Sequence, residues 1–158
     1  MHSHLAQQDH KGVVFVGVNS GGEFIMQKVA NYFRKADGLK PNFYSLTGLP
    51  DDIAIWKPFP IDGQSENSLQ ASLDDKIVIL ADAAMNSGRT IVEALNESAR
   101  IARPKKTKVA VIYDGQDVRK YPVQPDFWAY RGKNGHENKQ ADLHISGKSK
   151  GIFMRDLN

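Results

Sequence analysis

An aspartate and a short polar turn stand between two apolar segments in the stretch VILADAAMNSGRTIVEAL, residues 78–95. The apolar run before Asp82 predicts a buried strand, and apolar residues at helical spacing resume after the turn. The first N–H groups of a helix lack intrahelical partners, and the helix dipole adds positive character there. The turn therefore suits an anion such as phosphate. The residues assigned to this anion site are Asn86, Ser87, Gly88, Arg89 and Thr90.

The alternative for this turn is a simple helix cap, with Ser87 or Thr90 as the N-cap and Gly88 as a turn residue. A cap does not explain Asp82, which follows a buried strand on the side of the sheet where ligands collect. A carboxylate in that place can accept hydrogen bonds from sugar hydroxyls or help to hold Mg²⁺. Asp82 is therefore the predicted sugar and metal contact.

The elements that position these residues alternate along the chain. Apolar spacing predicts strands at residues 13–18, 42–46, 77–81, 109–113 and 127–130, and helices at residues 24–35 and 90–101. This order predicts an α/β protein with an open, mostly parallel twisted sheet flanked by helices. The loops after parallel strands meet at one edge of the sheet, so the candidate residues should converge. Residues 49–69 have no clear pattern beyond a possible short strand, and so long a loop is usually functional or mobile.

Composition narrows the class of protein. The 158 residues, 41% hydrophobic and 25% charged, fit a single domain at residues 12–158 after a disordered tail at residues 1–11. Cysteine is absent, which excludes disulfides and thiol chemistry. No apolar run predicts a membrane span or signal peptide, so we expect a cytoplasmic protein without membrane contact. The net charge of +3 suits an anionic ligand or RNA, although scattered lysines explain it equally well. The basic cluster comprises Arg103, Lys105, Lys106 and Lys108.

The spacing from Asp82 to the turn at residues 87–90 resembles the phosphoribosyl pyrophosphate (PRPP) signature of type I phosphoribosyltransferases. That signature has two adjacent acids after an apolar strand, and Ala83 stands here at the second position. The similarity covers roughly residues 12–133 and is greatest to the pyrimidine-operon attenuation regulator/uracil phosphoribosyltransferase group. It implies the type I phosphoribosyltransferase fold with a small or reduced hood.

The resemblance also implies roles for further residues. Asp82 and Lys57, the one cation in the 49–69 loop, become the catalytic candidates, with Mg²⁺ as cofactor and Asp82 as its ligand. The pyrophosphate of PRPP would lie on Asn19, Ser20, Gly21 and Gly22. The nucleobase, preferably a pyrimidine such as uracil, would contact Asp114, Phe127 and Trp128. Relatives of this kind assemble, so a homo-oligomer is expected on that analogy.

Ala83 leaves three outcomes open: a slow enzyme, a site adapted to another phosphorylated ligand, or a regulatory domain without turnover. Losing one carboxylate removes a charge-assisted hydrogen bond, which is worth about 1.5–3 kcal/mol, and so weakens PRPP binding without abolishing it. The leading function is then an Mg²⁺-dependent phosphoribosyltransferase that acts on a nucleobase, and the alternative is a catalytically impaired regulator. Such a regulator would bind PRPP or a nucleoside monophosphate, and RNA through its basic surface.

Overall fold

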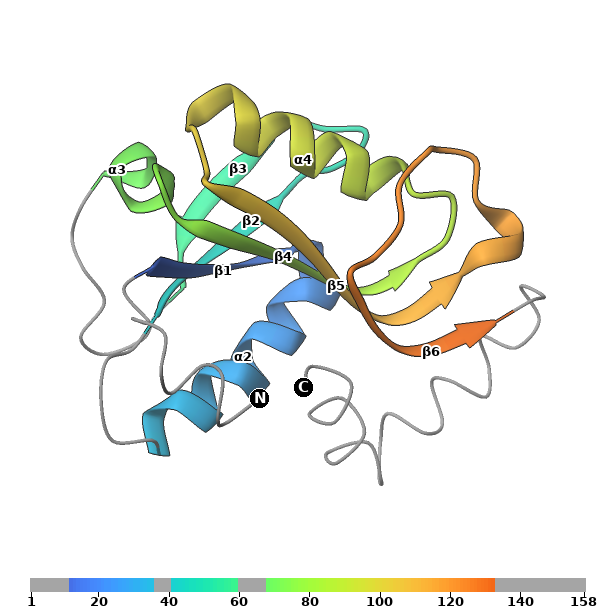
Figure 1. Ribbon diagram of the computed structural model, residues 1–158, viewed down its shortest axis with the longest axis horizontal. Coiled ribbons are helices and arrows are strands. Elements are labelled where there is room, and N and C mark those ends of the chain that lie inside the picture. The colour runs from blue at the N-terminus through green and yellow to red at the C-terminus, as the bar shows by residue number, and fades with distance from the viewer. Residues whose placement is uncertain (1–11, 36–40, 60–67, 133–158) are drawn as a thin grey trace.

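A single six-stranded sheet forms the centre of the protein in the computed structural model, which describes residues 12–35, 41–59 and 68–132 (Figure 1). The strands are β1 (Val13–Val18), β2 (Asn42–Thr47), β3 (Ile55–Pro58), β4 (Ile77–Met85), β5 (Lys106–Gly115) and β6 (Phe127–Gly132). The helices are α2 (Asn19–Lys35), α3 (Leu69–Leu73) and α4 (Arg89–Ile101), with a 3-10 turn η2 (Gln116–Val118).

The strands lie in the order β3-β2-β1-β4-β5-β6. All neighbouring pairs are parallel except β2 and β3, which run antiparallel at one edge. The predicted open, mostly parallel sheet is confirmed. Because β1 and β4 lie side by side, the segments that follow them emerge next to each other at the carboxyl edge, where ligands of such sheets bind.

Helices cover the two faces of this sheet (Figure 1). On one face, α2 buries Ile25, Met26 and Ala30 against Phe15 and Phe43. On the other face, α4 buries Ala94 and α3 buries Leu73 in a cluster with alternate residues of β1, β2 and β4. Successive side chains of a strand point to opposite faces, so strands buried on both sides read as continuous apolar runs. Packing of the helices on both faces holds the strands, and therefore their carboxyl ends, in fixed positions.

Several elements extend beyond their predicted bounds. The ladder between β4 and β5 continues to Met85 paired with Asp114, so Asp82 and Asp114 lie within strands rather than after them. Helix α2 begins at Asn19, five residues before the predicted start at Phe24. Helix α3 was not predicted, because five residues give too short a periodic pattern. Polar residues in these segments interrupt the apolar spacing, so the spacing does not indicate the strands and helices that the backbone forms there.

Within the described ranges, every helix is too short or too polar to cross a bilayer. The predicted tail at residues 1–11 lies outside the described residues.

Candidate active site

The turn between β4 and α4 is built around Gly88. Gly88 is the N-cap residue of α4 with a left-handed φ of 88°, and no side chain caps the helix. The predicted alternative, a cap by Ser87 or Thr90, is therefore not what the structure contains. The Ser87 hydroxyl accepts only a long hydrogen bond of 3.3 Å from the Arg89 N–H. The start of α4 is thus left available for a ligand.

A hollow of about 210 Å³ opens at this turn. Eight consecutive residues, 84–91, line it, and they include all five residues predicted for the anion site. No acidic residue lies in the first turn of α4, so nothing there offsets the positive end of the helix dipole. The hollow suits a small anion such as phosphate.

The segment after η2 packs against the turn and forms hydrogen bonds with it. The N–H groups of Lys120 and Tyr121 donate to the Ser87 carbonyl at 2.9 and 3.0 Å. A Cβ atom at Gly88 would lie 2.7 Å from Val123 Cγ1, so only glycine fits between the helix and this segment. The turn is held in place by the chain behind it rather than by its own side chains.

Asp82 lies half-buried on β4, and its Oδ1 accepts a 2.7 Å hydrogen bond from the Ala83 N–H. Burial raises the pKa of Asp82 from its ordinary value of 3.8 to about 6, although hydrogen bonds from the Ala83 and Ala84 backbone oppose the rise. In the described ranges no three His, Asp or Glu side chains gather as a metal cage. One carboxylate completed by substrate oxygens is nevertheless a common way to bind Mg²⁺, and Asp82 fits that pattern.

The residues predicted to bind pyrophosphate form the first turn of α2 and lie next to Asp82. A Cβ atom at Gly21 would come within 2.8 Å of both Asp82 Oδ1 and the Ala83 Cβ atom. Asn19 begins the helix with a φ of 54° and donates from Nδ2 to the Leu49 carbonyl at 2.7 Å. The structure therefore brings the start of α2 to the Asp82 carboxylate.

Arg89 forms ion pairs with two acids outside the turn. Its guanidinium pairs with Asp51 at 2.8 Å and with Glu93 at 3.1 Å. Asp51 belongs to the loop between β2 and β3, so the pair ties that loop to the start of α4.

Asp114 is fully buried and holds two arginines. Its Oδ1 accepts from Arg119, and its Oδ2 accepts from Arg131 Nε at 2.8 Å. Arg119 also donates to the Val123 carbonyl at 3.0 Å, in the segment that packs against the turn between β4 and α4. Sequence reasoning missed both arginines as site residues. They lie 5 and 17 positions from Asp114, separations without a local pattern that could reveal the pairing.

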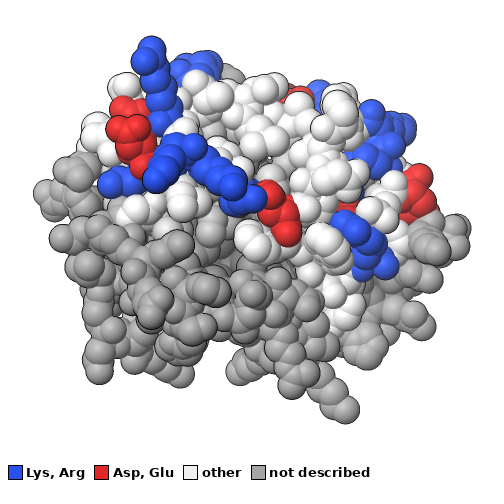
Figure 2. All heavy atoms as spheres, in the orientation of Figure 1, with Lys and Arg blue, Asp and Glu red and all other residues white. Residues whose placement is uncertain are grey.

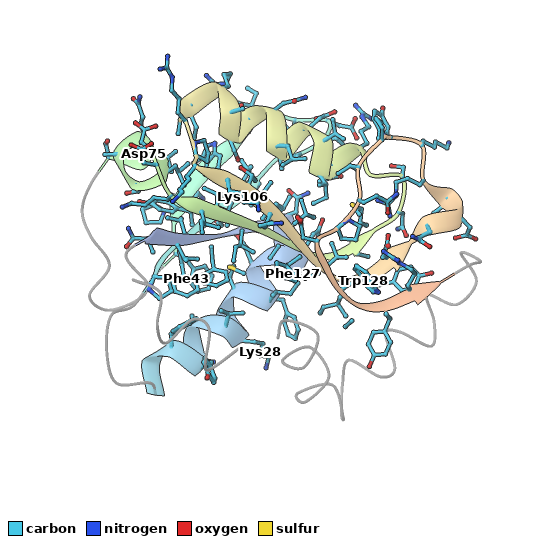
Figure 3. The ribbon with its side chains drawn as sticks, viewed as in Figure 1. Lys28, Phe43, Asp75, Lys106, Phe127 and Trp128 are labelled. Atoms are coloured by element: carbon cyan, nitrogen blue, oxygen red, sulfur yellow. The ribbon has the colours of Figure 1, made fainter. Side chains whose placement is uncertain are left out.

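Phe127 and Trp128, the two aromatic residues predicted to contact the base, begin β6 (Figure 3). Neighbours on a strand point to opposite faces, so a single base can stack on only one of them. Trp128 is the more exposed ring, and the Arg131 guanidinium carbon lies 3.6 Å from its centroid. Asp126 anchors the strand, because Oδ2 accepts from the Val109 N–H at 2.8 Å and Oδ1 pairs with Lys108 at 2.7 Å.

Lys57 lies apart from these residues. It is exposed on the edge strand β3, opposite Ser45 of β2. Three strand spacings of about 4.8 Å separate β3 from β4, more than a lysine side chain spans. The structure places the start of α2 next to Asp82, on the strand that leads into α4, but it does not bring Lys57 to Asp82.

Comparisons with known proteins agree with this geometry. The family model for the phosphoribosyl transferase domain matches residues 2–145. The bifunctional protein PyrR of Limosilactobacillus fermentum is 30% identical over 149 residues, covering 88% of this chain and 78% of the relative. PyrR of Latilactobacillus sakei is 32% identical over 130 residues, covering 76% and 69%.

Among solved structures, the hypoxanthine phosphoribosyltransferase of Trypanosoma cruzi matches with a TM-score of 0.62 at 11% identity, covering 84% of this chain and 69% of that one. A purine phosphoribosyltransferase from Pyrococcus horikoshii matches with a TM-score of 0.51 at 19% identity, covering 79% and 74%. These structures share the fold, and the resemblance drawn from the sequence is confirmed. The chain belongs to the phosphoribosyltransferase family.

Proposed function

We propose that this protein binds PRPP with Mg²⁺ and transfers its phosphoribosyl group to a nucleobase, preferably a pyrimidine such as uracil. The observation that carries the proposal is the start of α4 behind Gly88, which no side chain caps and which follows the strand that carries Asp82. The family membership and the similarity to PyrR proteins support it.

In this proposal each part of PRPP has its own support. The 5′-phosphate accepts hydrogen bonds from the first N–H groups of α4 and from the hydroxyls of Ser87 and Thr90. Asp82 accepts hydrogen bonds from the ribose hydroxyls, and the start of α2 donates N–H groups to the pyrophosphate. Asp82 would hold Mg²⁺, which neutralises charge on the departing pyrophosphate.

In this reaction the side chains form no covalent bond with the substrate. The ribosyl carbon becomes cation-like as the pyrophosphate leaves, so the rate depends on positioning the base and on stabilising the negative charge of the leaving group. The donors that open α2 and α4 are fixed before the substrate arrives, and this preorganisation is the source of the rate.

Titration calorimetry with PRPP and Mg²⁺, combined with pyrophosphate release in the presence of uracil, tests the proposal. We expect PRPP to bind, with Thr90→Val weakening it about tenfold through one lost hydrogen bond to a charged group. Thr107→Val, in the amino-terminal part of β5, is the matched control and should leave binding unchanged. If PRPP does not bind at millimolar concentration, both the proposed binding site and the proposed reaction are wrong.

A second candidate is a regulator that binds PRPP or a nucleotide without turnover. Ala83 favours it, because Asp82 is left as one acid where the family signature has two. A regulator would gain thermal stability from the ligand but release no pyrophosphate with any common base. Measurable turnover would exclude it.

A regulator of this kind would bind RNA. For either function, the protein would form a homo-oligomer. Lys and Arg side chains gather where β5 begins, interspersed with acids (Figure 2). Lys105 and Lys106 are exposed there, while Lys108 is paired with Asp126. Filter binding across a salt series tests the RNA contact, since phosphate contacts make affinity fall steeply with salt. Light scattering tests the assembly.

A further inference from the structure

Asp114 is a buried acid with both of its oxygens engaged. Its side chain is 0% exposed, Oδ1 accepts from Arg119, and Oδ2 accepts from Arg131. The buried carboxylate offers a base no exposed surface, and displacing Arg119 to reach it would leave a buried arginine charge uncompensated, which is strongly unfavourable. The group presented to a ligand at this end of the sheet must therefore be one that Asp114 holds.

Arg131 is the accessible member of the pair. The Arg119 side chain is 9% exposed, and its terminal nitrogens donate to the carbonyls of Val123 and Met85 as well as to Asp114. The Arg131 side chain is 32% exposed and uses Nε for Asp114. Within the described part of the chain, its two terminal nitrogens have no protein acceptor, so their hydrogens are available to a ligand.

Two contacts fix the direction of the Arg131 guanidinium. Asp114 holds it through Nε, and the Trp128 ring lies 3.6 Å from its central carbon, close enough for a cation–π contact. In the ladder, Asp114 lies between Met85 of β4 and Arg131 of β6. Arg131 is thus about 10 Å, two strand spacings, from the strand that leads into the turn at residues 86–90, and β5 lies between them.

We propose that Arg131 is the specificity-determining residue for the base, and that Asp114 and Trp128 are positioning residues that act through it. The inference rests on the proposed function. A guanidinium donates hydrogen bonds and accepts none, so it favours a base edge that carries carbonyl oxygens. A base with an exocyclic amine at that edge brings donor against donor and is disfavoured. The substrate class is therefore an oxo base rather than an amino base.

Binding measurements on the full chain test this without requiring turnover. Dissociation constants are determined for ribose 5-phosphate, uridine monophosphate and cytidine monophosphate. The wild type should bind uridine monophosphate at least tenfold more tightly than cytidine monophosphate. Arg131→Met should weaken uridine monophosphate by about 10-fold to 100-fold, the contribution of a charge-assisted hydrogen bond, and leave ribose 5-phosphate unchanged.

Two variants serve as controls. Arg131→Lys keeps the charge but loses the planar fork, so it should recover part of the discrimination. Arg103→Met removes an exposed arginine at the opposite end of the strands and should change none of the three constants.

Three other outcomes of the binding measurements would contradict the inference. If Arg131→Met weakens all three ligands equally, Arg131 has only a structural role and the inference fails. If it changes none of them, the inference fails while the phosphate site stands. If the wild type binds none of the three ligands, the proposed function fails, and base selection by Arg131 fails with it.

Discussion

Asp82 is the residue whose charge the fold opposes most directly, because burial raises its pKa to about 6. The folded state then binds the proton more tightly than the unfolded state, so stability falls as pH rises from 3.8 towards 6. Asp82→Asn removes this penalty and should stabilise the free protein by about 1–2 kcal/mol at pH 8 but hardly at pH 4. Urea unfolding at the two pH values measures the gain.

The exposed acid Asp117 provides the matched control, and Asp117→Asn should change stability little at either pH. An equal gain from both variants, or a gain for Asp82→Asn that is largest at pH 4, would contradict the assignment. The same substitution should weaken PRPP binding, so stability and affinity should move in opposite directions, as is common at functional sites.

Ala83 offers a gain of function at the same place. Its Cβ atom lies beside Gly21 at the start of α2, where the α2 dipole favours a negative charge. Ala83→Asp should restore a second ligand for Mg²⁺ and a ribose acceptor, and so tighten Mg²⁺-dependent PRPP binding about tenfold. Calorimetry with and without Mg²⁺ checks this. Ala84→Asp adds a carboxylate to the lining of the hollow at the start of α4, so it should give no such gain and should instead weaken PRPP binding by charge repulsion. Equal gains from the two variants would contradict the assignment.

At the scale of elements, the Asp126 carboxylate adds side-chain contacts to the ladder that joins β6 to β5. Asp126 accepts a hydrogen bond from the Val109 N–H at 2.8 Å and pairs with Lys108 at 2.7 Å. Asp126→Ala leaves that backbone donor without its side-chain partner and should cost about 1–3 kcal/mol. Lys108→Met removes only the ion pair and should cost less than about 1 kcal/mol.

Chemical denaturation separates the two contributions of Asp126. If the two variants lose the same stability, the ion pair and not the backbone contact secures β6. Because β6 carries Trp128 and Arg131, Asp126→Ala should also weaken discrimination between bases, and nucleotide binding provides that second readout.

The elements also show what sequence reasoning can reach. Apolar spacing was sufficient for β1, α4 and the cores of β4 and β5, because burial on both faces imposes it. The spacing from Asp82 to Thr90 indicated the turn between β4 and α4 because that pattern is local. The conformation of Gly88 depends on its packing against Val123, and Asp114 pairs with Arg131 of the next strand. Contacts of this kind between separate segments leave no pattern in a single sequence.

Considered as a whole molecule, the sheet has its site near the middle and a tryptophan near each edge. Trp56 lies on β3 and donates from Nε1 to Glu97 at 3.2 Å, whereas Trp128 lies on β6. PRPP in the proposed pose contacts the starts of α2 and α4, which follow the central strands β1 and β4. Binding should therefore stabilise both halves of the sheet together rather than one edge alone.

Single-tryptophan variants make this measurable, since the chain has only two tryptophans. Trp56→Phe leaves a reporter at β6, and Trp128→Phe leaves one at β3. At PRPP about 100 times above Kd, linkage adds about 2.7 kcal/mol and should raise both fluorescence-detected Tm values by roughly 5–10 °C. Unphosphorylated ribose should shift neither, because the start of α4 then lacks its anion. A rise at one edge only would mean that the ligand binds away from the central strands.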